Sequence, residues 1–271
     1  MKTSVLLFLT DIMPEKRRLY DKVVKNKIFD NSTATKVFQE FKKNGINGIE
    51  ILIPQSVKPK DIDDLKKVVD ENKIKIYSVH QPLRFLTKTK PTEIKKLFEI
   101  AKLYSSKIIV LHMSSVGKQL FNTKYIEELH LLEKEYGIKI GFENQEKHVG
   151  SVLNSYCWHS EKFAQLIAKH DFNITLDICH LGQTKGDIVE FFKKNKDRIV
   201  NIHLSDYRAH LLNNSLRPIR FKHMPLGAGQ LPIKELIQVL KKENYKGMLT
   251  LEVETNLEGL LDSIRYINAT S

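Results

Sequence analysis

Six short apolar runs of the sequence each end in a side chain that can bind a metal ion or move a proton. The six terminal residues are His80, His112, Glu143, Asp177, His203 and Glu252. In the run "NITLDI", Thr175 lies two positions before Asp177, and the intervening Ile174 and Leu176 are apolar. Because side chains alternate between the two faces of a strand, the polar members of such a run share one face. The pattern predicts that these carboxylates and imidazoles gather at one place in the fold.

Three carboxylates at one place repel one another unless a cation lies between them, which is the physical reason to expect a divalent metal ion as cofactor. Glu143, Asp177, His203 and Glu252 form a ligand set suited to Mn, Co, Zn or Mg, since carboxylates favour the harder ions and imidazole the later transition metals. His80 and His112 leave two alternatives. They hold a second metal, with Glu143 bridging, or they hydrogen-bond the substrate.

Eight apolar runs alternate with eight segments of helical periodicity. The runs cover residues 4–10, 48–53, 73–80, 107–113, 138–144, 173–178, 198–206 and 247–254. The helical segments cover residues 33–44, 59–72, 91–104, 123–136, 158–170, 185–195, 231–244 and 257–267. Strict alternation at this length predicts an α/β fold, a single (β/α)₈ TIM barrel over residues 1–271, whose catalytic groups come from the strand ends. A doubly wound open sheet is the alternative.

Long connections follow the first and the seventh run, at residues 11–31 and 207–230, and connections after strands lie at the active-site face of such a barrel. His180 comes three residues after Asp177, so we expect it in a loop over the barrel mouth. The later connection carries "RFKHMPLGAG", which brings His223 toward the site, and it also contains Arg208. An arginine there would hold a phosphate or sugar oxygen, unless it is merely solvated.

The composition is that of a globular protein with a lysine-rich surface. The net charge is +12, and lysine supplies 36 of the 44 basic residues. Lysine residues distributed along the chain indicate a solvated surface more than a phosphate-binding one, which would more often contain arginine. The positive charge also suits a phosphorylated substrate or a nucleic-acid partner. No apolar run approaches the roughly 20 residues needed to span a membrane, and only two cysteines occur. We therefore expect a soluble, cytoplasmic protein without a membrane partner. The sequence does not decide between a monomer and a homo-oligomer.

Five motifs resemble those of the xylose isomerase-like TIM-barrel superfamily, which includes sugar isomerases and epimerases as well as endonuclease IV. The motifs are "FEN", "LDICH", "NIHLSD", "HMPLGAG" and "LEVE", and the resemblance covers nearly the whole chain. It implies that Glu143, Asp177, His203 and Glu252 bind the shared catalytic metal. It also implies that Glu143 and Glu252 move protons and that His180 contacts the substrate.

The resemblance favours a metal-dependent isomerase or epimerase acting on a small sugar, a sugar phosphate or a polyol. In that chemistry Glu143 or Glu252 removes the proton next to a carbonyl and the other returns it, while His180 and Arg208 orient the substrate. The alternative is a zinc phosphodiesterase on abasic DNA. The further ligands of endonuclease IV match His80, His112, His180 and His223. Phe221, however, stands where that branch has Asp. A metal-binding barrel without enzyme activity is a third class.

Overall fold

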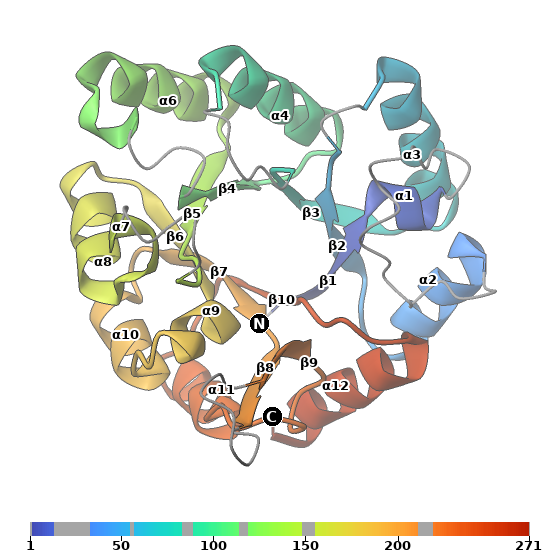
Figure 1. The fold of residues 1–271 in the computed structure, drawn as a ribbon. Coiled ribbons are helices and arrows are strands. Elements are labelled where there is room, and N and C mark those ends of the chain that lie inside the picture. The colour runs from blue at the N-terminus through green and yellow to red at the C-terminus, as the bar shows by residue number, and fades with distance from the viewer. Residues whose placement is uncertain are drawn as a thin grey trace.

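The computed structural model describes residues 2–13, 33–54, 57–82, 89–113, 119–147, 155–210 and 219–270. Eight parallel strands form a closed barrel, seen end-on in Figure 1. They are β1 (Lys2–Phe8), β2 (Gly48–Leu52), β3 (Lys75–His80), β4 (Ile108–His112), β5 (Lys139–Glu143), β6 (Asn173–Asp177), β7 (Ile199–Leu204) and β10 (Met248–Leu251). The ring order is β1-β10-β7-β6-β5-β4-β3-β2, so the first and last strands pair and close the barrel. The prediction of a (β/α)₈ barrel is confirmed, and the open sheet is wrong.

Among the described residues, eight longer helices form the outer layer, and they surround the ring of strands (Figure 1). They are α2 (Ala34–Lys43), α3 (Pro59–Glu71), α4 (Pro91–Leu103), α6 (Thr123–Tyr136), α8 (Ser160–Lys169), α10 (Ile188–Asn195), α11 (Ile233–Lys242) and α12 (Leu257–Thr270). In α11 the buried residues Ile233, Leu236, Ile237 and Leu240 follow helical spacing, so one face of the helix packs on the barrel. Among the described helices, none is long and apolar enough to cross a membrane.

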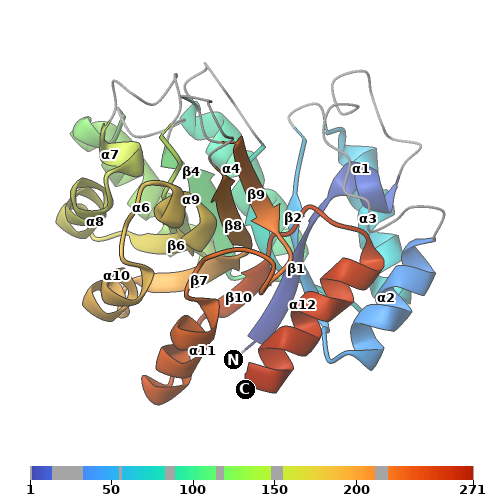
Figure 2. The same cartoon turned by 60° about the horizontal axis from the view of Figure 1, so that its bottom comes forward.

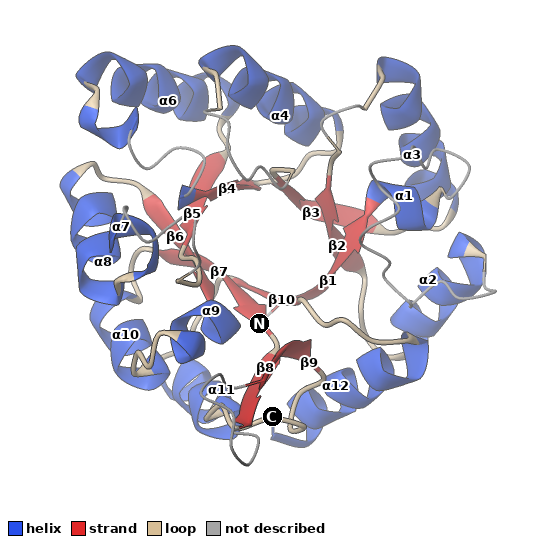
Figure 3. Ribbon diagram, in the orientation of Figure 1, coloured by secondary structure: helices blue, strands red, loops and turns tan. Residues whose placement is uncertain are grey.

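Shorter elements follow several strands at the carboxyl end of the barrel. They are α1 (Leu9–Ile12), η4 (Gln119–Phe121), α7 (Ser155–Trp158), α9 (Ile178–Gln183) and an antiparallel hairpin of β8 (Asp206–His210) and β9 (Ile219–Met224). Figure 3 shows the hairpin apart from the closed ring of strands. In Figure 2 the chain ends lie at the bottom of the molecule, whereas α1 and α7 lie at the top. The elements that follow strands therefore mark the opposite end, where TIM barrels carry their sites.

Candidate metal centre

Four of the predicted ligands converge at the mouth of the barrel. Glu143 ends β5, Asp177 ends β6, His203 lies in β7 and Glu252 follows β10 directly. One ligand atom from each lies within 4.8 Å of the others. The sheet register produces this closeness, because Asp177 pairs with His203, and His203 pairs with Thr250, two residues before Glu252. The structure thus brings together the residues predicted to hold one metal ion.

The buried polar atoms of this cluster fit a cation. Glu143 Oε2, Asp177 Oδ2, His203 Nδ1 and Glu252 Oε2 are buried and have no hydrogen-bond partner among the described residues. His203 Nδ1 lies 2.8 Å from Glu252 Oε2 and 3.4 Å from Glu143 Oε1. Burying several charges together is costly unless each is paired. Carboxylate oxygens and one imidazole nitrogen facing a common point satisfy that requirement when a divalent ion lies among them.

The second predicted ligand group adjoins the first through Glu143. Glu143 Oε2 lies 3.2 Å from His112 Nε2 and 3.5 Å from His80 Nε2. His80 Nδ1 donates to the backbone carbonyl of Gln81 at 2.7 Å, so its Nε2 is the nitrogen left to bind a metal. One ligand atom from each of His80, His112 and Glu143 lies within 4.8 Å of the others. The geometry therefore has the shared carboxylate that a bridged pair of metals requires.

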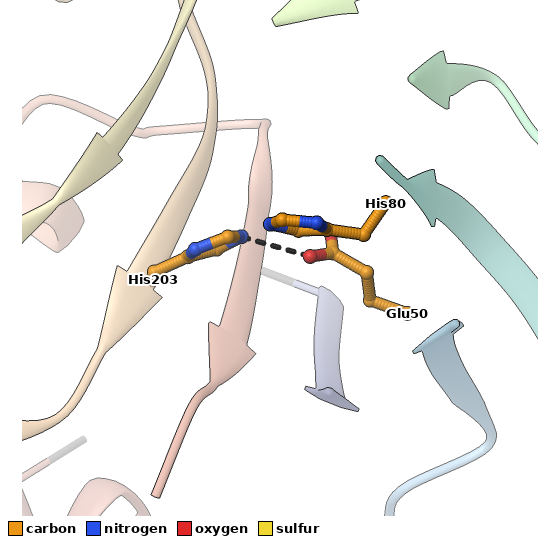
Figure 4. Close-up of side chains that lie close together, drawn as sticks. All are labelled: Glu50, His80 and His203. Carbon is orange, nitrogen blue, oxygen red and sulfur yellow. Dashed lines mark ion pairs between the residues drawn. The ribbon is translucent and has the colours of Figure 1, made fainter. Parts of the chain in front are cut away.

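Glu50 also belongs to this cluster, although the sequence interpretation did not select it. It lies within β2, is fully buried, and its Oε1 is 2.9 Å from His203 Nε2 (Figure 4). Glu50, His80 and His203 form a third group with ligand atoms within 4.8 Å of one another. The signal was present in the run "GIEILI", where a carboxylate stands between Ile49 and Ile51. It was missed because only strand ends were considered as sites.

The cluster shifts the pKa values of its members in different directions. Burial raises the pKa of Asp177 to about 6 and lowers that of His112 to about 4. Burial alone would raise the pKa of Glu252, but the charges of His203 and His223 outweigh it and bring the value to about 2. The pKa of Glu143 is likewise well below its usual range, because His203 and His80 outweigh its burial. Both glutamates are therefore ionised at neutral pH, which is the form that binds a cation.

His180 lies in the first turn of α9, so the expectation that it stands in a loop was wrong. The reason is a helix cap, because Asp177 Oδ1 accepts the His180 backbone N–H at 2.7 Å and so begins α9 directly after β6. His180 Nδ1 lies 3.2 Å from Asp177 Oδ2 and 3.0 Å from the Asn144 carbonyl oxygen. Its side chain is 14% exposed. His180 therefore reaches the edge of the cluster, as expected, but from a helix tied to Asp177.

Asn144, which follows β5, fixes the end of β6. Its Nδ2 donates to the Asp177 carbonyl and its Oδ1 accepts the Asp177 N–H, each at 2.8 Å. Both residues are buried. One amide side chain thus pairs both backbone groups of Asp177 and sets the position of its carboxylate.

The connection after β7 brings His223 to the cluster but leaves Arg208 in a different setting. The rings of His180 and His223 lie 5.5 Å apart at 86°, and His223 Nδ1 is 3.2 Å from Ser205 Oγ. The Arg208 guanidinium donates to the backbone carbonyl of Ala228. That bond lies within the connection itself, so a substrate contact of Arg208 stays a prediction.

Asp206 holds this connection in shape. Its carboxylate accepts the backbone N–H groups of Tyr207, Gly227, Gly229 and Leu231, at 2.8 to 3.1 Å. An added Cβ at Gly229 would lie 2.3 Å from Asp206 Oδ1, so only glycine permits this approach. The "LGAG" turn is therefore folded around a buried carboxylate and stands beside the mouth.

Comparison with known proteins identifies a matching family and several similar proteins. A family model described as "Xylose isomerase-like TIM barrel" matches residues 38–270. The inosose isomerase of Halalkalibacterium halodurans is 22% identical over 247 residues, which cover 83% of this chain and 84% of the relative. An inosose dehydratase of Clostridium perfringens is 26% identical over 250 residues, covering 77% and 81%. A solved D-tagatose 3-epimerase-like protein superposes with a TM-score of 0.69 at 20% identity, covering 100% of this chain and 97% of that one.

Proposed function

The chain belongs to the xylose isomerase-like TIM-barrel family, and from that premise we propose that it is a divalent-metal-dependent isomerase or epimerase of a small sugar, sugar phosphate or polyol. The observation that carries the proposal is the convergence of Glu143, Asp177, His203 and Glu252, whose unpartnered buried atoms face one another. Relatives named as an inosose isomerase and an inosose dehydratase support a carbonyl-bearing polyol as substrate class.

In this proposal Glu143, Asp177, His203 and Glu252 hold the metal. A divalent cation bound there would act as a Lewis acid on a substrate carbonyl and its adjacent hydroxyl. Glu143 or Glu252, in its ionised form, removes the proton from the carbon next to the carbonyl. The other glutamate takes up a proton from solvent and delivers it to the opposite face or to the neighbouring carbon. The first glutamate then releases its proton to solvent, so no proton is gained or lost overall and both glutamates are ionised again after each turnover.

The groups at the rim orient the substrate. His180 is partly exposed beside the cluster and would hydrogen-bond a substrate hydroxyl, while His223 packs against its ring. Arg208 would take a phosphate or hydroxyl oxygen after exchanging its bond to Ala228. Isomerases, epimerases and dehydratases of polyhydroxy ketones all begin by removing a proton next to the carbonyl, and they differ in what leaves or returns afterward. The same pair of glutamates therefore suits all three outcomes.

The proposal is tested by hydrogen exchange in heavy water. Ketoses and inososes, free and phosphorylated, are incubated with the protein and Mn²⁺, Co²⁺, Mg²⁺ or Zn²⁺, and deuterium next to the carbonyl is followed by NMR. We expect exchange with the wild type and a rate lower by about 10²- to 10⁴-fold in Glu252→Gln. Glu254→Gln is the matched control, because Glu254 is exposed and lies two residues further along the chain. Absence of exchange with every substrate and metal would overturn the proposal.

The second candidate is a zinc phosphodiesterase acting on abasic DNA, in which neighbouring metals activate a water molecule. The observation that favours it is the group of His80 and His112 around Glu143, together with the adjacent rings of His180 and His223. Phe221, which is 47% exposed, argues against a third metal at that pair because it supplies no ligand. An abasic duplex incubated with the zinc-loaded protein separates the two functions. Nicking without proton exchange on any ketose would establish the phosphodiesterase instead.

A further inference from the structure

A carboxylate lies deeper in the barrel than the candidate metal ligands. Glu50 belongs to the middle of β2, not to its end, and its side chain is fully buried between strands β3 and β7 (Figure 4). An isolated carboxylate in a barrel interior would be strongly unfavourable. Its surroundings must therefore explain why it is there.

One oxygen of Glu50 is fully occupied by hydrogen-bond donors. Oε2 accepts from Ser78 Oγ at 2.5 Å and from Asn201 Nδ2 at 2.8 Å. The Asn201 amide is itself oriented, because its Oδ1 accepts from Thr250 Oγ1 at 2.9 Å, and Thr250 Oγ1 lies 2.8 Å from Ser4 Oγ. This chain of contacts spans four strands beyond β2 and fixes the carboxylate plane. The second oxygen, Oε1, consequently faces His203.

The two ring nitrogens of His203 face different carboxylates. Nε2 lies 2.9 Å from Glu50 Oε1, as the dashed line in Figure 4 marks. Nδ1 lies 2.8 Å from Glu252 Oε2 and 3.4 Å from Glu143 Oε1, on the side of the candidate metal ligands. Among the described residues, neither Nε2 nor Oε1 has a hydrogen bond to another group. The inner nitrogen and the inner oxygen thus face each other, with His80 as the third member of their group.

We propose that Glu50 is a positioning residue for His203, whose Nε2–H it binds so that Nδ1 carries the lone pair toward the metal side of the ring. The proposal rests on the metal-dependent function proposed above. A neutral imidazole has one N–H, and a carboxylate that accepts it selects the tautomer and raises the basicity of the other nitrogen. Glu50 acts through His203 and touches neither substrate nor metal.

The tautomer of His203 in the wild-type protein gives the first test. Protein labelled with ¹⁵N-histidine is loaded with Zn²⁺, and two-bond ¹H–¹⁵N correlations are assigned through the backbone. We expect Nε2 of His203 to carry a slowly exchanging proton and Nδ1 to show the shift of a metal-bound nitrogen. A protonated Nδ1, or metal at Nε2, would overturn the proposal without any variant having to fold.

The Glu50→Gln variant gives the second test. Because Ser78 and Asn201 both need an acceptor, the Gln oxygen faces them and its NH₂ group faces His203 Nε2. That group donates to Nε2 and so favours the wrong tautomer. Zn²⁺ and Mn²⁺ affinities are measured by competition with a chelator. We expect a loss of about 10- to 100-fold with unchanged stoichiometry. The melting temperature of the metal-free protein should fall, because Glu50 is paired with His203 and removal of one partner of a buried pair is destabilising.

Two controls separate positioning from the other roles. Glu40→Gln, at a partly exposed residue paired with Lys43, should leave metal affinity unchanged. Ser78→Ala, which removes one donor and keeps the carboxylate, should lose less metal affinity than Glu50→Gln. Wild-type affinity in Glu50→Gln with a lowered melting temperature would show a purely structural role, and loss of one bound metal would show a direct ligand. Either result overturns the proposal. If Glu50→Gln weakens metal binding but the wild type exchanges no ketose proton, only the proposed function is overturned. If the wild type binds no metal, both the proposed function and the role of Glu50 are overturned.

Discussion

At the scale of single residues, the position of Asp177 depends on the amide of Asn144. That amide pairs with both the N–H and the C=O of Asp177. Asn144→Ala leaves the buried N–H of Asp177 without its acceptor and removes one donor from its C=O, so we expect the free energy of unfolding to fall by about 1–3 kcal/mol. Metal affinity should fall as well, because the Asp177 carboxylate is no longer held. Urea denaturation and chelator competition measure the two effects.

Asn72→Ala is the matched control for this prediction. Asn72 lies at the end of α3, where its Nδ2 donates to the carbonyl of Val68 at 2.8 Å, away from the cluster. The control should cost about 1 kcal/mol or less and leave metal affinity unchanged. Equal effects of the two substitutions on metal binding would contradict the role given to Asn144.

Sequence reasoning identified most of the cluster but not the residues that hold it. Glu143, Asp177, His203 and Glu252 could be predicted because strand ends of a barrel meet at one mouth. Glu50 lies one layer deeper, and its role depends on the distance to His203, which the strand register sets across the barrel. Asn144 was part of a quoted motif, yet its bonds to Asp177 join two strands and have no local signal.

At the scale of elements, the approach of β5 to β6 requires a glycine at position 141. An added Cβ there would lie 2.4 Å from Thr175 Oγ1 and 3.4 Å from the Thr175 nitrogen. Gly141→Ala should therefore lower the free energy of unfolding by about 1–3 kcal/mol and displace Glu143, two residues along β5. Denaturation and metal titration check both outcomes.

The double variant Gly141→Ala/Thr175→Ala decides whether this contact is the cause. Thr175 Oγ1 has no hydrogen-bond partner in the described structure, so its removal costs little and frees the space. We expect the double variant to recover much of the lost stability. Strictly additive effects would show that the two residues do not clash.

The junction of α6 and β5 predicts a pH dependence of stability. Glu133 Oε1 accepts the Ile140 N–H at 2.7 Å, and burial raises the Glu133 pKa above its ordinary 4.5, although the bond from Ile140 and the nearby His130 lower it in part. A raised carboxyl pKa means that the folded state binds the proton more tightly. The stability that this tighter proton binding adds is fully present below pH 4.5, and it is lost as pH rises through the pKa that Glu133 has in the folded state.

Glu133→Gln measures this contribution, because its amide oxygen can still accept from Ile140 and does not titrate. Unfolding free energies of both proteins are compared from pH 4 upward. The wild type should lose stability relative to Glu133→Gln as pH rises. Parallel pH curves would contradict the prediction.

The long elements were predictable, and the short ones were not. Alternating strand and helix patterns give the eight barrel strands and eight outer helices directly. By contrast, α9 has six residues and begins because Asp177 caps it, and the β8–β9 hairpin stands beside a turn folded around Asp206. Such elements form through contacts between distant residues, so periodicity does not reveal them.

At the scale of the whole molecule, closure of the barrel makes the site. Ser4 on β1 and Thr250 on β10 meet although 246 residues separate them, and their contact continues through Asn201 to Glu50. The candidate metal ligands at the barrel mouth therefore lie above a layer of polar side chains, and the contacts of that layer form only when the barrel is closed. Metal affinity and global folding should be coupled, since metal that binds only the folded chain stabilises it.

The metal content of the wild type and three variants tests the central claim most directly. Metal per chain is measured by elemental analysis after equilibration with Mn²⁺ or Zn²⁺ and removal of free ions. Glu143 belongs to the ligand group with Asp177, His203 and Glu252 and also to the group with His80 and His112, so Glu143→Gln should lose all bound metal. Where the wild type binds a second metal, His112→Gln should lose that metal alone. Glu254→Gln should match the wild type. A wild type without metal, or a Glu143→Gln variant with full metal content, would contradict the account.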